Sequence, residues 1–205
     1  MSARDGILAA IRAAYAPGRP KAPAPVRPDH GDTPGDLDLF VERVEDYRAV
    51  VTRCRPEDLS DRVAAALAGE TGAETGTGAA PSVVVPADLG IDLPGARVDD
   101  GLSAADLDGV DAVVTRAAVG IAETGTIILD HGPGQGRRII SLLPDLHVCI
   151  VTADQVVADV PQAIARLDPV RPQTWISGPS ATSDIELDRV EGVHGPRTLH
   201  VMLVG

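Results

Sequence analysis

The chain has 205 residues, of which 44% are hydrophobic, and this is enough for one domain with a substantial core. Its formal net charge is −12, from 30 acidic and 18 basic residues, and only 2% of the residues are aromatic. Nucleic-acid binding needs a basic surface and often aromatic platforms for the bases, so this composition argues against a nucleic-acid partner. No apolar run reaches the length of a membrane span, and the N-terminus does not have the pattern of a secretory signal. We therefore expect a cytoplasmic protein that does not enter the membrane.

Two cysteines, Cys54 and Cys149, are far apart and form no Cys-x-x-Cys pair. This spacing argues against a disulfide framework and against a self-contained zinc or iron–sulfur site. No flavin or nicotinamide motif is evident either. We therefore expect neither a metal site nor a cofactor in this chain.

The first 35 residues are expected to form an appendage. Apolar residues recur at helical spacing within residues 2–16, namely Ile7, Leu8, Ile11 and Tyr15. The stretch that follows, APGRPKAPAPVRPDHGDTPG, is too rich in proline for regular structure and is typical of an extended linker. The sequence thus divides into a helix with a linker at 1–35 and a domain at 36–205.

Two more amphipathic helices are expected at the start of the domain. Apolar residues at helical spacing mark the first, namely Leu37, Phe40, Val41, Val44, Tyr47 and Val51. Pro56 suits the first turn of the second helix, in which Leu59, Val63 and Leu67 face inward.

Short β-branched segments alternate with helical patterns from residue 82 onward. The segments are 82–86, 111–115, 126–129, 147–151, 174–177 and 199–204. The clearest helical pattern is 153–167, although Pro161 must kink it or mark its boundary. This alternation predicts an α/β fold with a largely parallel sheet that is covered on both faces. The strand order cannot be read from the sequence.

The pentapeptide AETGT occurs twice, at 73–77 and at 122–126. The first copy lies among small and polar residues, which is typical of a flexible loop without function. The second copy runs directly into the apolar segment 126–129, and an acidic side chain at its Glu123 has no packing role there. Ligands of open α/β sheets collect near strand ends, so the second copy is the better candidate for a site.

Glu123 is therefore our candidate catalytic residue, as a base, a nucleophile or a ligand anchor. Its neighbours Thr124, Gly125 and Thr126 are candidate ligand-binding residues, because two of them carry hydroxyl groups. The alternative is a turn with a solvated glutamate.

A second polar segment reads WISGPSATSDIE. This segment predicts a sharp turn, whose N–H groups and hydroxyls can hold a carboxylate or a phosphate. Its candidate ligand-binding residues are Gly178, Pro179, Ser180, Thr182 and Asp184. In the alternative interpretation, Asp184 only caps a helix and Gly178 only supplies an unusual backbone dihedral. We expect this turn and Glu123 to lie at the same edge of the sheet and to share one pocket.

Three further residues are candidate ligand-binding residues. His194 precedes a Gly-Pro turn, where a structural role is the alternative. Arg137 and Arg138 follow the glycine-rich stretch HGPGQG, which matches neither a Walker loop nor a dinucleotide fingerprint. The two arginines either meet an anion or belong to a solvated hairpin turn.

The order of three segments resembles the LUD domain of the lactate utilization protein C family. These segments are AETGT before a strand, GRR followed by LPDLHVCIV, and ISGPSATSDIE followed by VEGVHGP and a strand. The match is strongest over 111–205. It implies a three-layer α/β sandwich like that of the NagB/RpiA/CoA-transferase superfamily. It also implies a cytoplasmic role in the oxidation of L-lactate to pyruvate, beside iron–sulfur subunits.

Two cysteines cannot ligate the four-cysteine clusters that such electron transfer would use. We therefore predict an accessory, non-redox protein of L-lactate utilization that binds a partner subunit or a small carboxylate, phosphate or acyl ligand. The resemblance also leaves open an enzyme related to CoA transferases or sugar-phosphate isomerases, with Glu123 as nucleophile or base. A third possibility is an interaction module that uses residues 1–35 as a tether. Ala181 departs from the family pattern, which has a basic residue after Gly-Pro-Ser, and this weakens a charged anion site in that turn.

Overall fold

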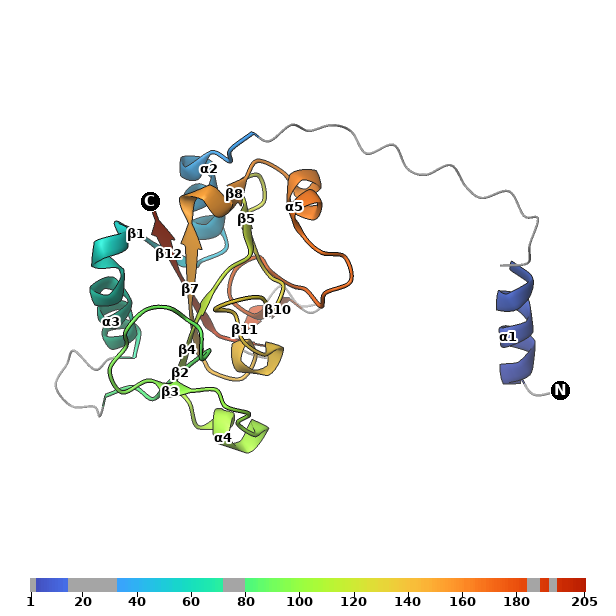
Figure 1. Cartoon of the computed structure of the whole chain (residues 1–205), viewed down its shortest axis with the longest axis horizontal. Helices are drawn as coiled ribbons and strands as arrows, with labels where there is room; N and C mark the ends of the chain where they lie inside the picture. The colour runs from blue at the N-terminus through green and yellow to red at the C-terminus, as the bar shows by residue number, and fades with distance from the viewer. Residues whose placement is uncertain (1–2, 15–32, 72–79, 184–188, 192–194) are drawn as a thin grey trace.

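The computed structural model describes residues 3–14, 33–71, 80–183, 189–191 and 195–205 (Figure 1). A six-stranded parallel sheet forms the centre of the domain, in the order β1-β12-β7-β4-β2-β3. In this spatial order the strands are β1 (Val50–Cys54), β12 (Thr198–Val204), β7 (Leu146–Thr152), β4 (Ala112–Arg116), β2 (Val83–Val85) and β3 (Arg97–Val98). The central strands β7 and β12 are almost continuously apolar, because both of their faces are covered.

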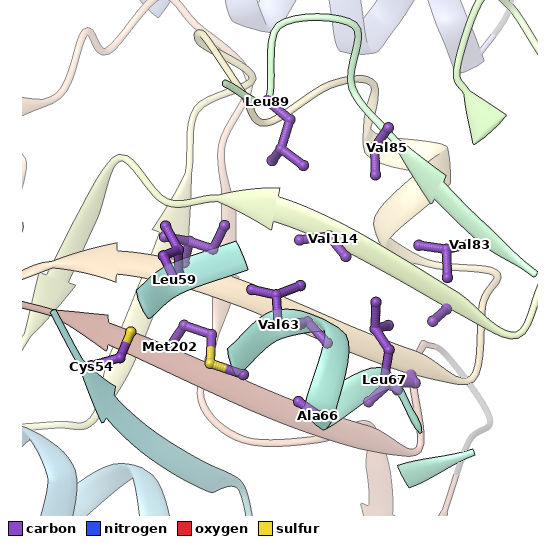
Figure 2. Packing of buried hydrophobic residues seen from close by; sticks show 14 of the residues in the cluster. Cys54, Leu59, Val63, Ala66, Leu67, Val83, Val85, Leu89, Val114 and Met202 are labelled. Carbon is purple, nitrogen blue, oxygen red and sulfur yellow. The ribbon is translucent and has the colours of Figure 1, made fainter. Parts of the chain in front are cut away.

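One face of the central sheet is covered by helix α3 (Leu59–Glu70), which follows the 3-10 turn η1 (Pro56–Asp58). Figure 2 shows Val63 and Leu67 of this helix lying over the strands that carry Val114 and Met202. Val63 is completely buried. Pro56 stands at the start of the 3-10 turn that leads into the helix, so the predicted helix start is confirmed.

The opposite face of the central sheet is covered by helix α2 (Leu37–Asp46) and by a second, four-stranded sheet. The order in the second sheet is β8 (Val156–Val157), β5 (Val119–Ile121), β6 (Thr126–Leu129) and β9 (Thr174–Ile176). Phe40 and Val44 of α2 are packed with Cys149 and Val151 of β7. Coverage on both faces confirms the predicted α/β three-layer sandwich with a mostly parallel sheet.

Two short helices complete the packing of this side. Helix α5 (Val160–Arg166) covers the second sheet, where Ala163 packs with Ile121 and Ile128. Helix α4 (Ala104–Asp108) and the 3-10 turn η3 (Arg138–Ser141) lie over β4, where Leu107 and Ile140 pack on Val113.

The helix predicted over 153–167 is wrong in its first half. Residues 153–155 form a 3-10 turn (η4), and Val156 and Val157 pair with Gly120 and Ile121 as strand β8. The helix begins after Asp159, whose side chain accepts a hydrogen bond from the N–H of Gln162. Both valines are buried, so the apolar spacing that resembles a helix arises from a strand followed by a helix.

The predicted helix over 37–51 is also too long. It ends at Asp46, and Val51 belongs to β1, which pairs with β12. The β-branched run at 50–52 fits a strand better than a helix, and its pairing with a distant segment settles the boundary.

Helix α1 (Ala3–Ala14) confirms the predicted N-terminal helix, and none of its residues is buried. Ile7 and Ile11, on its apolar side, are 62% and 49% exposed. Most of the proline-rich linker lies outside the described residues. A hairpin of β10 (Ala181–Ser183) and β11 (Arg189–Glu191) follows the Gly178 turn. Among the described residues, no helix is long and apolar enough to cross a membrane.

Candidate functional site

A cavity of about 260 Å³ lies between β9, the turn after it, η3 and the first residues of β7 and β12. Its polar lining residues are Arg138, Ser141, His147, Thr174, Ser177 and Ser180. Its apolar lining includes Trp175, Ile176 and Leu199. No acidic side chain lines it within the part of the chain that the structure describes. The cavity is therefore suited to a small ligand that is negatively charged or rich in hydrogen-bonding groups.

The turn after β9 brings three of the predicted residues into this lining, namely Gly178, Pro179 and Ser180. Gly178 has φ +86°, and a Cβ atom there would lie 2.5 Å from the Cβ of Tyr47. Both the positive φ and the close approach to the end of α2 require glycine. The N–H of Ser180 donates to the carbonyl of Pro196 at 2.8 Å, which joins the turn to the segment before β12.

Glu123 lies in the tight turn between β5 and β6, where it is exposed to solvent. Its backbone N–H donates to the carbonyl of Ala158 at 3.1 Å. Gly125 has φ +60°, and a Cβ atom there would lie 2.5 Å from the carbonyl carbon of Arg43. The turn is therefore pressed against α2 in the same way as the Gly178 turn, because only glycine fits the contact.

A chain of hydroxyl groups connects the Glu123 turn to the edge of the cavity. Thr124 Oγ1 donates to Thr126 Oγ1 at 2.7 Å, and Thr126 Oγ1 is 2.8 Å from the hydroxyl oxygen of Ser177, which lines the cavity. Glu123 itself does not line it. The two predicted segments are thus neighbours, but the expected common pocket does not include the Glu123 carboxylate, because its turn points the side chain into solvent.

The neighbouring arginines Arg137 and Arg138 differ in their surroundings. The guanidinium of Arg137 donates to both carboxylate oxygens of Asp99, at 2.8 and 2.5 Å, and to the carbonyl of Leu102. The hydrogen bond from Arg137 is the main reason that the pKa of Asp99 is lowered. Arg137 does not line the cavity and holds a loop in place.

Arg138 lines the cavity and is exposed on one side. Its guanidinium forms no ion pair or hydrogen bond with any residue that the structure describes. It is the only cationic side chain among the described lining residues, because His147, the other basic residue of the lining, is buried and neutral at pH 7. Arg138 is therefore the predicted residue best placed to hold an anion.

His147 lies in the cavity wall and was not singled out from the sequence. It is the second residue of β7 and only 1% exposed, and its Nε2 is 2.8 Å from the hydroxyl oxygen of Thr115. Burial lowers the pKa of His147 to about 4, so its imidazole is neutral at pH 7. The available signal was a histidine inside the apolar segment LHVCIV, where an ionisable side chain is rare. Thr174, Trp175 and Ser177 were missed because nothing in their spacing marks a cavity.

The glycine-rich stretch before Arg137 is a structural loop. The side chain of Gln135, which is 4% exposed, accepts from the N–H of Asp130 and donates to the Asp130 carboxylate at 2.9 Å. Arg171 donates to the same carboxylate at 3.0 Å. The loop therefore uses its polar groups internally and is neither a phosphate-binding loop nor a fully solvated turn.

Several predictions remain outside what the structure describes. Asp184, His194 and the first AETGT copy lie in the undescribed segments, and Thr182 is placed only as a β10 residue opposite Val190. Within the described residues, no group of three or more histidine, cysteine or acidic side chains could hold a metal ion. Cys54 and Cys149 are free and buried, and burial raises the pKa of the Cys149 thiol to about 12.

The fold and the site define an α/β sandwich protein with a small polar cavity beside its central sheet. Residues 98–204 match the family model of the LUD domain. The chain is 45% identical to lactate utilization protein C of Deinococcus radiodurans, over 97% of this chain and 94% of that protein. A protein of the same name from Shouchella clausii is 36% identical over 42% of this chain and 40% of its own length.

A solved structure supports the same assignment. The crystal structure of a DUF162 family protein from Deinococcus radiodurans is 41% identical and superposes with a TM-score of 0.65, covering 82% of this chain and 96% of that one. The chain therefore belongs to the LUD domain family, and the resemblance seen in its motifs is confirmed.

Proposed function

We propose that this chain is an accessory, non-redox protein of L-lactate utilization that acts beside iron–sulfur subunits and binds a small carboxylate in the cavity beside β7 and β9. The names of its relatives support the pathway. The observation that carries the ligand class is Arg138, a guanidinium without a described partner in a cavity lined by hydroxyl groups and by no described acidic side chain.

The size and chemistry of the cavity favour a compact anion. A volume of about 260 Å³ matches a few-carbon acid with some water, since one water occupies about 30 Å³ of liquid. A guanidinium can donate two parallel hydrogen bonds to a carboxylate. Hydroxyl groups of the cavity wall can donate further hydrogen bonds to the same carboxylate in place of water. The same groups would also hold a phosphate, so phosphate serves as a comparison ligand.

The positions of the cysteines support a role without a redox centre. Cys54 packs with the α3 side of the central sheet, and Cys149 packs with the α2 side. Separated by the sheet, the two thiols cannot serve one iron–sulfur cluster, which takes four protein ligands.

Calorimetric titration with L-lactate, pyruvate and inorganic phosphate tests the proposed ligand class. We expect a carboxylate to bind. Binding to the folded chain also raises the free energy of unfolding, by about 2.7 kcal/mol when the ligand is present at a hundred times its Kd. Arg138→Gln should weaken binding about tenfold or more, because a charge-assisted pair is lost. Arg137→Gln, which makes the same change one residue earlier, should leave the affinity unchanged. Equal losses in both variants, or no carboxylate binding at all, would contradict the proposal.

The alternative, an enzyme that uses Glu123 as nucleophile or base, is favoured by the hydroxyl chain from Thr124 through Thr126 to Ser177. Glu123→Gln removes the charge while keeping the size, and the exposed site predicts a stability change of no more than about 0.5 kcal/mol. Under this alternative, growth on L-lactate fails with Glu123→Gln and continues with the control Glu74→Gln in the other AETGT copy. Normal growth with both variants would remove Glu123 from the function.

A further inference from the structure

His147 is a buried polar group that carboxylate binding by Arg138 does not use. We infer that its Nδ1 accepts a hydrogen bond from the ligand, so that the cavity selects a 2-hydroxy acid over the corresponding 2-oxo acid. This inference rests on the proposed function, because it assumes that Arg138 holds the carboxylate.

The contacts of His147 leave one ring nitrogen for a ligand. The side chain is 1% exposed and lies in the cavity wall. Its Nε2 is 2.8 Å from the hydroxyl oxygen of Thr115 on the neighbouring strand β4. Its Nδ1 forms no hydrogen bond with any described residue. A ring nitrogen in the cavity wall that has no protein partner is available to a hydrogen-bonding group of a ligand in the adjoining cavity.

The hydroxyl of Thr115 determines which nitrogen carries the proton. A neutral imidazole has one N–H donor and one acceptor, and a hydroxyl has one proton to donate. The Thr115 hydroxyl also lies 3.9 Å from Cys149 Sγ, to which it can donate, and we therefore assign its oxygen as the acceptor of Nε2–H. With the proton on Nε2, Nδ1 of His147 is an acceptor.

An acceptor at this position distinguishes the oxidation states of a small acid. The C2 hydroxyl of a 2-hydroxy acid can donate to Nδ1 while Arg138 holds the adjacent carboxylate. The carbonyl of a 2-oxo acid has only lone pairs and would leave Nδ1 unsatisfied. A hydroxyl can both donate and accept, so we expect no discrimination between the two acids from Ser141, Thr174 and Ser177, whose hydroxyls already contact the Arg138 carbonyl, His131 Nε2 and Thr126 Oγ1.

Calorimetric titration at pH 7 with L-lactate, pyruvate and propionate tests this selectivity. We expect L-lactate to bind at least about tenfold more tightly than pyruvate, the effect of one well-placed hydrogen bond. Thr115→Val frees the imidazole to adopt either tautomer, so the preference should fall to about threefold or less while Arg138-dependent binding remains. The matched control is Thr52→Val, which removes the hydroxyl 2.8 Å from Nε2 of the other buried histidine, His200, and should leave the preference unchanged.

A measurement without ligand tests the tautomer directly. Long-range ¹H–¹⁵N correlation spectra of the imidazole should show the proton of His147 on Nε2, and a proton on Nδ1 would overturn the inference. Equal binding of lactate and pyruvate, or a preference for pyruvate, overturns it while leaving the proposed function intact. If no acid binds, the proposed function fails and the inference fails with it.

Discussion

Among the residues that the structure describes, two histidines are buried, on opposite faces of the central sheet. His147 of β7 faces the second sheet, and His200 of β12 lies beside Glu70 of α3, with 3.5 Å between His200 Nδ1 and Glu70 Oε1. In each case Nε2 is 2.8 Å from a threonine hydroxyl of the neighbouring strand, Thr115 or Thr52. Burial lowers the pKa of both imidazoles, because the charged form is poorly solvated inside the sheet packing.

The buried state of His147 predicts a pH dependence of stability. Its pKa is about 4 in the folded chain against 6.5 for an ordinary histidine, so the unfolded chain binds more protons between these values. The free energy of unfolding should therefore fall as the pH drops from 6.5 to 4, by up to about 3 kcal/mol from this residue. Urea unfolding across this range checks it. His147→Phe should show a weaker pH dependence than the parent, and the same slope in both would contradict the assignment.

Two arginine–aspartate pairs with the same 2.5 Å contact differ in burial. Arg137 meets Asp99, whose side chain is 3% exposed, whereas Arg53 meets Asp38, whose side chain is 86% exposed. Arg137→Gln should lower the free energy of unfolding by about 1–2 kcal/mol, since it leaves a buried carboxylate with fewer partners. Arg53→Gln should cost no more than about 0.5 kcal/mol, because the exposed Asp38 is solvated instead. Urea unfolding of the two variants should separate them, and similar losses would mean that burial does not decide the outcome.

At the scale of elements, both predicted site segments, the Glu123 turn and the Gly178 turn, pack against the C-terminal part of helix α2. The β5–β6 turn meets it at Arg43 through Gly125, and the turn after β9 meets it at Tyr47 through Gly178. The β6–β9 pairing, with Ile127 opposite Ile176, holds the two turns side by side. The position of the cavity therefore depends on how closely the second sheet approaches α2.

Gly178→Ala tests this close contact. The added Cβ would lie 2.5 Å from the Tyr47 side chain, and alanine disfavours a φ of +86°, so we expect a loss of about 2–4 kcal/mol. The control is Gly69→Ala in α3, where a Cβ meets nothing within 4 Å. That change should stabilise the chain by about 0.5–1 kcal/mol, because alanine is the better helix former. Thermal unfolding of both variants gives the comparison. An unchanged stability of Gly178→Ala would show that α2 can shift to accommodate the added Cβ atom.

For the whole molecule, charge divides the chain into two unequal parts. Residues 1–28 carry five basic side chains and one acidic side chain, whereas the rest of the chain is strongly acidic. The change in charge thus falls within the proline-rich stretch, before the domain boundary predicted between residues 35 and 36. Helix α1 buries none of its residues, so the body of the protein does not depend on it for packing.

Deletion of residues 1–32 should leave the thermal stability of the remaining chain almost unchanged, with a shift in Tm of no more than about 2 °C. The physical reason is that α1 contributes no buried apolar area. Differential scanning calorimetry of the shortened and full-length chains measures this. A fall of about 10 °C would mean that α1 packs on the body, and a loss of partner binding alone would assign the segment to an interface.

The sequence by itself determined the α/β class and half of the strands, namely β2, β4, β6, β7, β9 and β12. The segment 126–129 is strand β6 with the predicted bounds, because a β-branched run between glycine-containing turns has few other structures. It also determined that the second AETGT copy stands at a strand entrance and that residues 178–180 form a turn. These features are local, and the residues that cause them are neighbours in the chain.

The tertiary structure alone decided the strand order and which residues line the cavity. Strand β12, at 198–204, pairs with β1, at 50–54, although most of the domain lies between them in the sequence. Such pairing depends on packing between segments that share no sequence signal. Arg137 and Arg138 have the same chemistry, but the guanidinium of Arg137 is bound to Asp99, whereas Arg138 lines the cavity. The neutral state of His147 arises from the layers that bury it and from Thr115 on another strand. A sequence lists these groups, but only the folded chain brings them within hydrogen-bonding distance.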